Sequence, residues 1–373
     1  MNNKHITFFL LLVSIIFIYG WGANGHKIIN RRSTFSFPSP MTFLNWADSL
    51  AAHSSDADYR RSSDPNEAPR HYIDIDDYPE FIATGRIPQD LDSLIAIHGS
   101  TFVYDKGILP FSIMATADSI KKYFQLQNYQ KAMLHSADLG HYVGDGHNPL
   151  HITRNYNGQY TNQTGVHSRY ETQLINRDSA NIIYSFENAE YIPNINQFVF
   201  DFLYNNYTYV DSVLRYDSIA NAMAPGYGTT YYQRYWQLAG NFTIMLFNNA
   251  SHFISSLIYT SWVNAGGAVS VSTIETMLPE KFYLEQNYPN PFNPSTKIKF
   301  GIPDLHDHNS GGSFTRLTIY DISGKEITNL INQQLQPGTY EVVWNAVDFP
   351  SGTYFYRLSS DIYTESKRMF LLK

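Results

Sequence analysis

The residue types best suited to chemistry are concentrated between His141 and Glu171. His141 and Asp145 are four residues apart, and His151 follows them. His167 and Glu171 repeat the spacing of four. Residues at this spacing point to one side of a helix, and imidazole nitrogens and carboxylate oxygens are zinc ligands. One such pair is ordinarily a helix-surface pair or a satisfied core histidine, but burying five such side chains would be costly without a cation. The segment therefore predicts a metal site.

Further candidates lie nearer the N-terminus, beginning with the stretch from Trp21 to His26. If a leader peptide is removed before Trp21, the new α-amine and the Trp21 carbonyl oxygen form a five-membered chelate that His26 is close enough to complete. His71 and the acidic residues Asp56 and Asp58 are also candidates. Each is ordinary by itself, because a single loop histidine is seldom a ligand.

Residues 1–20 predict the leader that this chelate requires. Lys4 supplies a positive charge, and an apolar run from Ile6 to Ile18 follows it. This is the pattern of a secretory signal peptide. The run is too short for a comfortable membrane span, although an uncleaved anchor is the alternative.

The elements that must position these residues are mainly helices. Apolar residues recur at helical spacing over 119–142 and 231–263, which predicts one long helix over each segment and a mostly α-helical catalytic domain at 21–265. Small, flexible residues at 266–281 predict a linker. Alternation with a period of two then appears at 296–300, 315–320, 339–344 and 353–358. Such short strands predict a small all-β, Ig-like sandwich at 282–373.

Composition limits the possible classes of function. The chain has 373 residues, a globular share of apolar residues and a net charge of −7, which argues against nucleic-acid binding through a broad basic face. Bound zinc would add positive charge at the ligands, so an acidic chain could still attract a phosphate. There is no cysteine, so any metal ligands are histidine, carboxylate or backbone groups.

In order and spacing, these candidates resemble the ligands of the bacterial zinc-dependent phospholipases C and the single-strand-specific zinc nucleases. The resemblance covers 21–265 and implies a mostly helical, phospholipase C/nuclease-like fold with three Zn²⁺ ions in a cleft. It implies that His71, His141, Asp145 and one acidic residue hold one ion. Trp21, His26 and a bridging Asp145 would hold the second ion, and His151, His167 and Glu171 the third.

The resemblance leaves two candidates for the remaining acidic ligand. Asp58, in Ala-Asp-Tyr, resembles the phospholipase segment and is preferred, whereas Asp56 has the nuclease-like distance to His71. In either case the residue would also act in catalysis, by orienting the attacking water or taking its proton.

The two branches of the superfamily imply different substrates. Glu171 and the phrase from Gly165 to Glu171 resemble the phospholipases and favour hydrolysis of a phospholipid. The patterns from Trp21 to His26 and from Gly144 to His151 resemble the nucleases, and single-stranded nucleic acid is the alternative substrate. A non-enzymatic surface binder with structural zinc is a third hypothesis. No stable protein partner is predicted.

The C-terminal sandwich carries a second resemblance. The stretch 284–300 and the last residues, 367–373, resemble the beginning and end of a type IX secretion sorting domain. The resemblance implies that residues 282–373 engage the type IX secretion machinery and that the protein is secreted or placed on the cell surface. An accessory adhesion module is the alternative.

Overall fold

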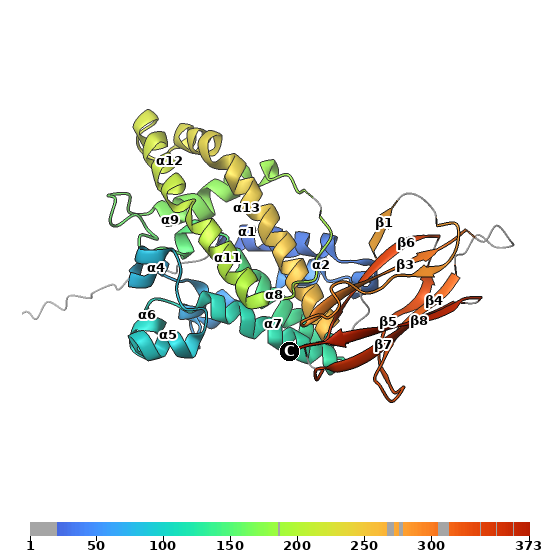
Figure 1. Ribbon diagram of the computed structural model, residues 1–373. Coiled ribbons are helices and arrows are strands. Elements are labelled where there is room, and N and C mark those ends of the chain that lie inside the picture. Colours follow the sequence, from blue (N-terminus) through green and yellow to red (C-terminus); the bar gives the residue numbers. More distant parts are fainter. Residues whose placement is uncertain are drawn as a thin grey trace, which may run out of the picture.

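The computed structural model describes residues 21–185, 187–266, 272–275, 279–304, 313–335, 337–347, 349–360 and 362–373. The predicted signal peptide lies outside these ranges, as do residues 267–271 and 276–278 of the predicted linker. Figure 1 shows a helical body followed by a body of β-strands. This confirms the prediction of a mostly helical domain followed by a small all-β sandwich.

The helical part carries the following α-helices: α1 (Gly22–Ser33), α2 (Ala47–Ala52), α3 (Asp56–Arg60), α4 (Pro79–Thr84), α5 (Leu91–His98), α6 (Ser100–Asp105), α7 (Leu109–Gln125), α8 (Tyr129–Gly146), α9 (Val166–Ser168), α10 (Ile175–Asp178), α11 (Ile195–Tyr207), α12 (Val210–Met223) and α13 (Thr229–Asn264). Short 3-10 turns lie at Thr34–Ser36, Ser39–Leu44, Ala68–His71, Ile75–Asp77, Pro149–His151 and Ser179–Asn181, and a π-helical turn lies at Arg169–Leu174.

Helix α13 runs diagonally through the helical body (Figure 1) and contacts α1, α7, α8 and α12. The apolar spacing at 231–263 thus forms one continuous helix. Its Phe247 packs edge-on against the indole of Trp21, with ring centroids 4.6 Å apart. The long helix therefore supports the beginning of α1, which carries His26.

The periodic segment 119–142 is not one helix, and this expectation is wrong. Helix α7 ends at Gln125, and Gln127 has a left-handed backbone with φ of 53°. The side chain of Asn128 then accepts a hydrogen bond from the backbone nitrogen of Lys131 and caps α8. Apolar spacing continues across the break because both helices bury a face in one core, so periodicity does not reveal the turn that the Asn128 cap marks.

Helices α1 and α8 approach each other closely because α8 presents two glycines to α1. A β-carbon at Gly140 would lie 2.1 Å from Asn30 Oδ1, and one at Gly144 would lie 2.9 Å from His26 Nδ1. Without side chains there, the His26 ring stacks on the His141 ring at 3.9 Å. The approach thus brings ligand candidates from the two helices together.

The β-domain consists of β1 (Ser272–Glu275), β2 (Tyr283–Leu284), β3 (Ser295–Ile302), β4 (Ser313–Tyr320), β5 (Glu326–Leu335), β6 (Gly338–Asn345), β7 (Gly352–Ser359) and β8 (Thr364–Leu371). Two antiparallel sheets have the strand orders β1-β6-β3-β2 and β5-β4-β7-β8. The four strands expected from alternation lie within β3, β4, β6 and β7. Strand β1 lies within the segment predicted as a linker and pairs with β6.

Alternation places one face of each sheet in the core of the β-domain. In β7, Tyr354, Tyr356 and Leu358 are buried, whereas the residues between them are exposed. Across β3 and β6, Phe300 pairs with Tyr340 and their rings stack at 5.5 Å. These residues belong to a core separate from that of the helices.

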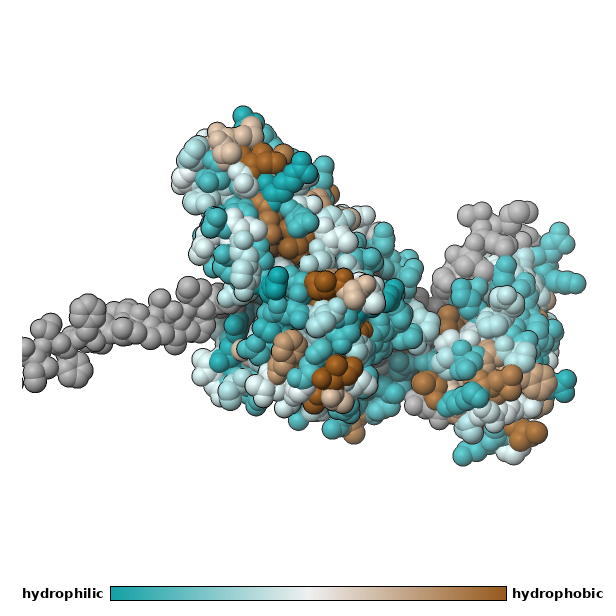
Figure 2. All heavy atoms as spheres, turned by 60° about the vertical axis from the view of Figure 1, so that its left-hand side comes forward, coloured by the Kyte–Doolittle hydropathy of each residue, from teal (hydrophilic) through white to brown (hydrophobic). Residues whose placement is uncertain are grey.

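The helical and β-domains are joined by apolar and polar contacts, and Val263 of α13 packs against the core of the β-domain. Asn345 of β6 donates to Tyr191 and, over 3.1 Å, to Asn264 Oδ1 at the end of α13. On the face in Figure 2, hydrophilic residues predominate and apolar residues lie in small separate patches. Within the described ranges, no helix combines the length and apolar character that a bilayer span requires.

Candidate metal centre

Three groups of buried imidazole and carboxylate side chains could hold metal ions. Within each group the ligand atoms lie within 4.8 Å of one another: His26, His141 and Asp145; Asp58, His71 and His141; and His151, His167 and Glu171. Because the first two groups share His141, they form one continuous cluster. Its residues come from α1, α3, the turn Ala68–His71 and α8.

Asp145 lies at the centre of this cluster. Its Oδ2 is 3.0 Å from His71 Nδ1 and 3.4 Å from His141 Nε2. Its Oδ1 is 3.4 Å from His26 Nε2. The two oxygens of one carboxylate thus face different histidines, which is the arrangement needed to bridge two cations.

Three histidines have their tautomer fixed by backbone carbonyl oxygens, which can only accept. His141 Nδ1 donates to Ser54 over 2.7 Å, His151 Nδ1 donates to His71 over 2.8 Å, and His167 Nδ1 donates to Tyr156 over 3.2 Å. With the proton on Nδ1, the neutral ring keeps its lone pair on Nε2. Such a contact to the outer nitrogen is typical of metal-binding histidines.

These Nε2 atoms face carboxylate oxygens, which are also acceptors. His141 Nε2 is 3.6 Å from Asp58 Oδ1, and His167 Nε2 is 2.8 Å from Glu171 Oε2. Neither oxygen of Asp58 has a hydrogen-bond partner, although the side chain is buried. Lone pairs facing one another in a dry interior are unfavourable unless a cation lies between them.

The spacing of these atoms fits a zinc ion. Two ligands about 2.0–2.1 Å from a tetrahedral zinc are about 3.4 Å apart. Among His71, His141, Asp58 and Asp145, the distances between facing nitrogen and oxygen atoms run from 3.0 to 3.8 Å. Donor type, lone-pair direction and spacing therefore all suit a zinc ion.

The third group lies on segments that follow α8. Pro149, which begins the 3-10 turn Pro149–His151, returns the chain so that His151 Nε2 lies 3.4 Å from Glu171 Oε2. Asn148 donates to the same oxygen over 3.2 Å. His167 is in α9 and Glu171 in the π-helical turn, a feature often found at functional sites.

Burial and neighbouring charges shift the pKa values of this cluster in opposite directions. Burial, together with nearby His26, lowers the pKa of His141 to about 4. Burial raises the pKa of Glu171 well above its usual range. Burial alone would raise the pKa of Asp145, but the surrounding histidines, led by His141, hold it well below its ordinary value.

The structure separates the two acidic candidates. Asp58 is buried in the cluster, whereas Asp56 is 38% exposed and its Oδ2 lies 2.7 Å from His53 Nδ1 at the surface. Trp21 is buried at the start of α1, and its ring packs against Tyr170 and Phe247.

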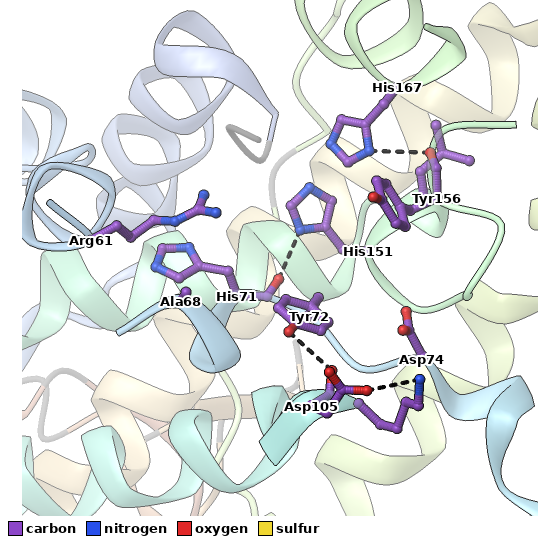
Figure 3. Close-up of a pocket in the computed structure, with 11 residues that line it drawn as sticks. Arg61, Ala68, His71, Tyr72, Asp74, Asp105, His151, Tyr156 and His167 are labelled. Carbon is purple, nitrogen blue, oxygen red and sulfur yellow. Dashed lines mark hydrogen bonds and ion pairs between the residues drawn. The ribbon is translucent and has the colours of Figure 1, made fainter. Parts of the chain in front are cut away.

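A pocket of about 340 Å³ opens beside the cluster. In Figure 3, the rings of His71, His151 and His167 lie along it, and the guanidinium of Arg61 points toward the same space. The remainder of the lining includes two aromatic and two acidic side chains, together with one lysine: Tyr72, Tyr156, Asp74, Asp105 and Lys106. The pocket therefore connects the candidate ligands with space for a small polar group.

The sequence prediction missed the residues that support the ligands. Arg61 lies three residues after Asp58, and its NH1 is 3.5 Å from Asp58 Oδ1. Glu67 lies four residues before His71, and its Oε1 is 3.5 Å from His71 Nε2. Burial alone would raise the pKa of Glu67, but His71, Tyr142 and Arg60 lower it to about 2. The short spacing from a ligand candidate was the signal that could have identified both residues.

A family model for a secretion system C-terminal sorting domain matches residues 286–371, which include β3 to β8. These residues form a type IX sorting domain. The prediction made for 282–373 is confirmed over the matched range. The sorting domain directs the protein through the outer membrane, so it is secreted or held at the cell surface. This confirms the predicted localisation and implies interaction with the type IX machinery.

Two solved structures that resemble the chain are alpha-toxins. The alpha-toxin of Clostridium perfringens from an avian strain has 12% identity and a TM-score of 0.41, over 93% of this chain and 91% of that chain. The alpha toxin of Clostridium absonum has 13% identity and a TM-score of 0.42, over 93% and 98%. A search of curated proteins gives no match.

Proposed function

We propose that this protein is an exported zinc-dependent phosphodiesterase that hydrolyses phospholipids in the manner of a phospholipase C. The main support is that buried imidazole lone pairs face buried carboxylate oxygens around Asp145, at distances suited to zinc. Two of the three groups contribute His71, His151 and His167 to the lining of a pocket large enough for a phospholipid head group.

Under this proposal, the residues of the cluster would hold three zinc ions. Asp58, His71, His141 and Asp145 would hold one ion. His26 and Asp145, with the amine and carbonyl oxygen of Trp21 after leader removal, would hold another, and His151, His167 and Glu171 the third. When bound, zinc ions would lower the pKa of water toward neutrality and offset the charge that develops on a phosphoryl group.

The chain's own residues then orient the substrate. Arg61 lies at the pocket edge nearest Asp58, where its guanidinium can bind phosphoryl oxygens. Under this proposal, Asp58 would orient the attacking water and accept its proton. Burial around the cluster excludes bulk water and strengthens each of these electrostatic interactions.

The pocket lining supports a phospholipid with a cationic head group. Tyr72 and Tyr156 offer aromatic rings, and Asp74 and Asp105 offer carboxyl groups. Such combinations attract an ammonium. The charge of Lys106 is offset there, because its Nζ lies 3.0 Å from both Asp77 Oδ2 and Asp105 Oδ2.

Single-strand nuclease activity is the second candidate, and the same aromatic residues favour it. Tyr72 and Tyr156 lie beside the candidate ligands, and aromatic faces in that position can stack on unpaired bases. Under this alternative, the metal centre and Arg61 keep their roles, and only the group held in the pocket differs.

Parallel assays on the zinc-loaded mature chain separate the two candidates. We expect the release of phosphorylated head group from phosphatidylcholine vesicles, its loss on chelation, and no release by the Asp145→Ala variant. Cleavage of single-stranded DNA or RNA without lipid hydrolysis would replace the phospholipase by the nuclease. If none of these substrates is hydrolysed by folded, zinc-containing protein, the phosphodiesterase proposal is wrong.

A further inference from the structure

Arg169 lies between two candidate ligands, His167 and Glu171, but points away from them. Its Nε donates to Asp217 Oδ1 over 2.8 Å, and one terminal nitrogen donates to Asp217 Oδ2 over 3.0 Å. Both side chains are buried. The two parallel bonds form the bidentate pairing that only arginine makes with a carboxylate.

The Arg169–Asp217 pair also holds the loop that precedes His167. Arg169 donates to the carbonyl oxygens of Gln163 and Thr164, each over 3.0 Å. The Gln163 side chain donates in turn to Asp217 Oδ2 over 2.8 Å. The loop and the ligand-bearing turn are therefore held at one point on α12, where Asp217 lies.

Two aromatic residues complete this anchor. Tyr231 of α13 donates its hydroxyl to Asp217, and the Arg169 guanidinium lies 4.1 Å from the centre of the Tyr227 ring. Asp217 thus accepts from Arg169, Gln163 and Tyr231, so its charge is well compensated. The anchor joins α12, α13 and the loop in one polar network.

The anchored loop also determines how His167 is held. Tyr156, in the same loop, accepts the Nδ1 proton of His167 and lines the pocket. On the other side of Arg169, Glu171 Oε2 lies 2.8 Å from His167 Nε2. Fixing Arg169 therefore fixes the carbonyl that orients His167 as well as the turn that carries Glu171.

We infer that Arg169 and Asp217 are positioning residues that hold the loop and the π-helical turn so that His151, His167 and Glu171 can bind their zinc ion. This rests on the metal centre of the proposed function. Buried ion pairs contribute little net stability compared with apolar residues of similar volume. A bidentate pair does, however, fix the orientation of the two side chains. Loss of the pair is therefore expected to lower the affinity for the third ion and to leave the affinity for the other two unchanged.

The test is a competition between a zinc-specific chelator and the mature chain, resolved for each of three ions. Arg169→Lys keeps the charge but loses the two parallel hydrogen bonds to Asp217. We expect this variant to bind the third ion about 10–100-fold more weakly, the range for residues that orient metal ligands. The other two ions should keep wild-type affinity. Arg177→Lys, which alters the nearby ion pair with Asp178, is the matched control. It should bind all three ions with wild-type affinity.

Wild-type affinity for all three ions in Arg169→Lys would overturn the inference. Parallel weakening of all three, in step with a lower melting temperature, would also overturn it, because a general stabilising role predicts that result. If Arg169→Lys does not fold, Asp217→Asn is measured against the same criteria. Three tightly bound ions without phosphodiesterase activity would contradict the proposed function but leave this measurement valid.

Discussion

At the scale of single residues, hydrogen-bond direction determines the chemistry of the cluster. Backbone carbonyls fix the Nδ1 proton of His141, His151 and His167, so each Nε2 lone pair points inward. The spacing of these histidines in the sequence predicted that they would lie together. It could not predict the carbonyl partners, because these come from segments folded against the ligands from elsewhere in the chain.

Asp58 and Asp56 provide a matched pair of substitutions. We expect Asp58→Asn to lower zinc affinity and turnover at least about 100-fold, because removing a ligand should exceed the effect of removing a residue that only orients one. Asp56→Asn should leave both near wild type, since Asp56 lies at the surface with His53. Zinc titration and initial rates check both. Equal losses in the two variants would contradict the assignment of Asp58.

Asp74 predicts a pH dependence of stability. Burial raises the pKa of its carboxyl group from 3.8 to about 7; Lys106 opposes this shift, while Asp76 and Asp77 add to it. Because the folded state binds this proton more tightly than the unfolded state, the stability linked to it is present below about pH 4. That stability is lost as the pH rises through 7.

Asp74→Asn should remove this loss. The difference in unfolding free energy, variant minus wild type, should therefore rise between pH 5 and pH 8 by on the order of 2 kcal/mol. Urea unfolding of both proteins at the two pH values measures it. A difference that does not change with pH would show that Asp74 ionises normally.

At the scale of elements, the close contact of α1 with α8 brings the ligands together. Glycine is required at Gly144 by the space available, since a β-carbon would lie 2.9 Å from His26 Nδ1. Periodicity predicted α13 but merged α7 with α8, because an apolar face continues through the turn. Close helix contacts depend on tertiary packing, and the break before α8 depends on the local Asn128 cap; periodicity records neither.

Gly144→Ala is therefore predicted to displace His26. The affinity for the zinc ion held by His26 and Asp145 should fall by about tenfold. This loss should occur although alanine favours a helix interior by roughly 0.5–1 kcal/mol over glycine. Gly228→Ala is the control, because a β-carbon there meets no atom within 4 Å. Unchanged zinc binding in the Gly144 variant would mean that α1 can shift without cost to the site.

At the scale of the whole molecule, the helical domain and the sorting domain have separate hydrophobic cores. The proposed catalysis therefore belongs to one domain and export to the other. The helical core contains the candidate site, whereas the sorting domain has its own core. Its motifs and alternating strands could be predicted from the sequence because pairing in an antiparallel sandwich follows a period of two. Strands β5 and β8 were not predicted, since polar residues interrupt their apolar pattern.

A chain truncated before Pro279 should keep zinc binding and turnover but remain in the periplasm. Two separate cores give the physical reason, because removing the β-domain leaves the helical core complete. Fractionation of cells that make the full and truncated chains, with assays of each fraction, checks this prediction. Export of the truncated chain at the normal level would contradict the sorting role.

The proposed function requires that the buried cluster of histidine and carboxylate side chains hold zinc. Anomalous diffraction from crystals of the zinc-loaded mature protein, collected on both sides of the zinc absorption edge, tests it most directly. Three peaks are predicted: one among Asp58, His71, His141 and Asp145, one beside His26 and Asp145, and one among His151, His167 and Glu171. A well-ordered structure without a zinc peak at any of these groups would contradict the proposed function.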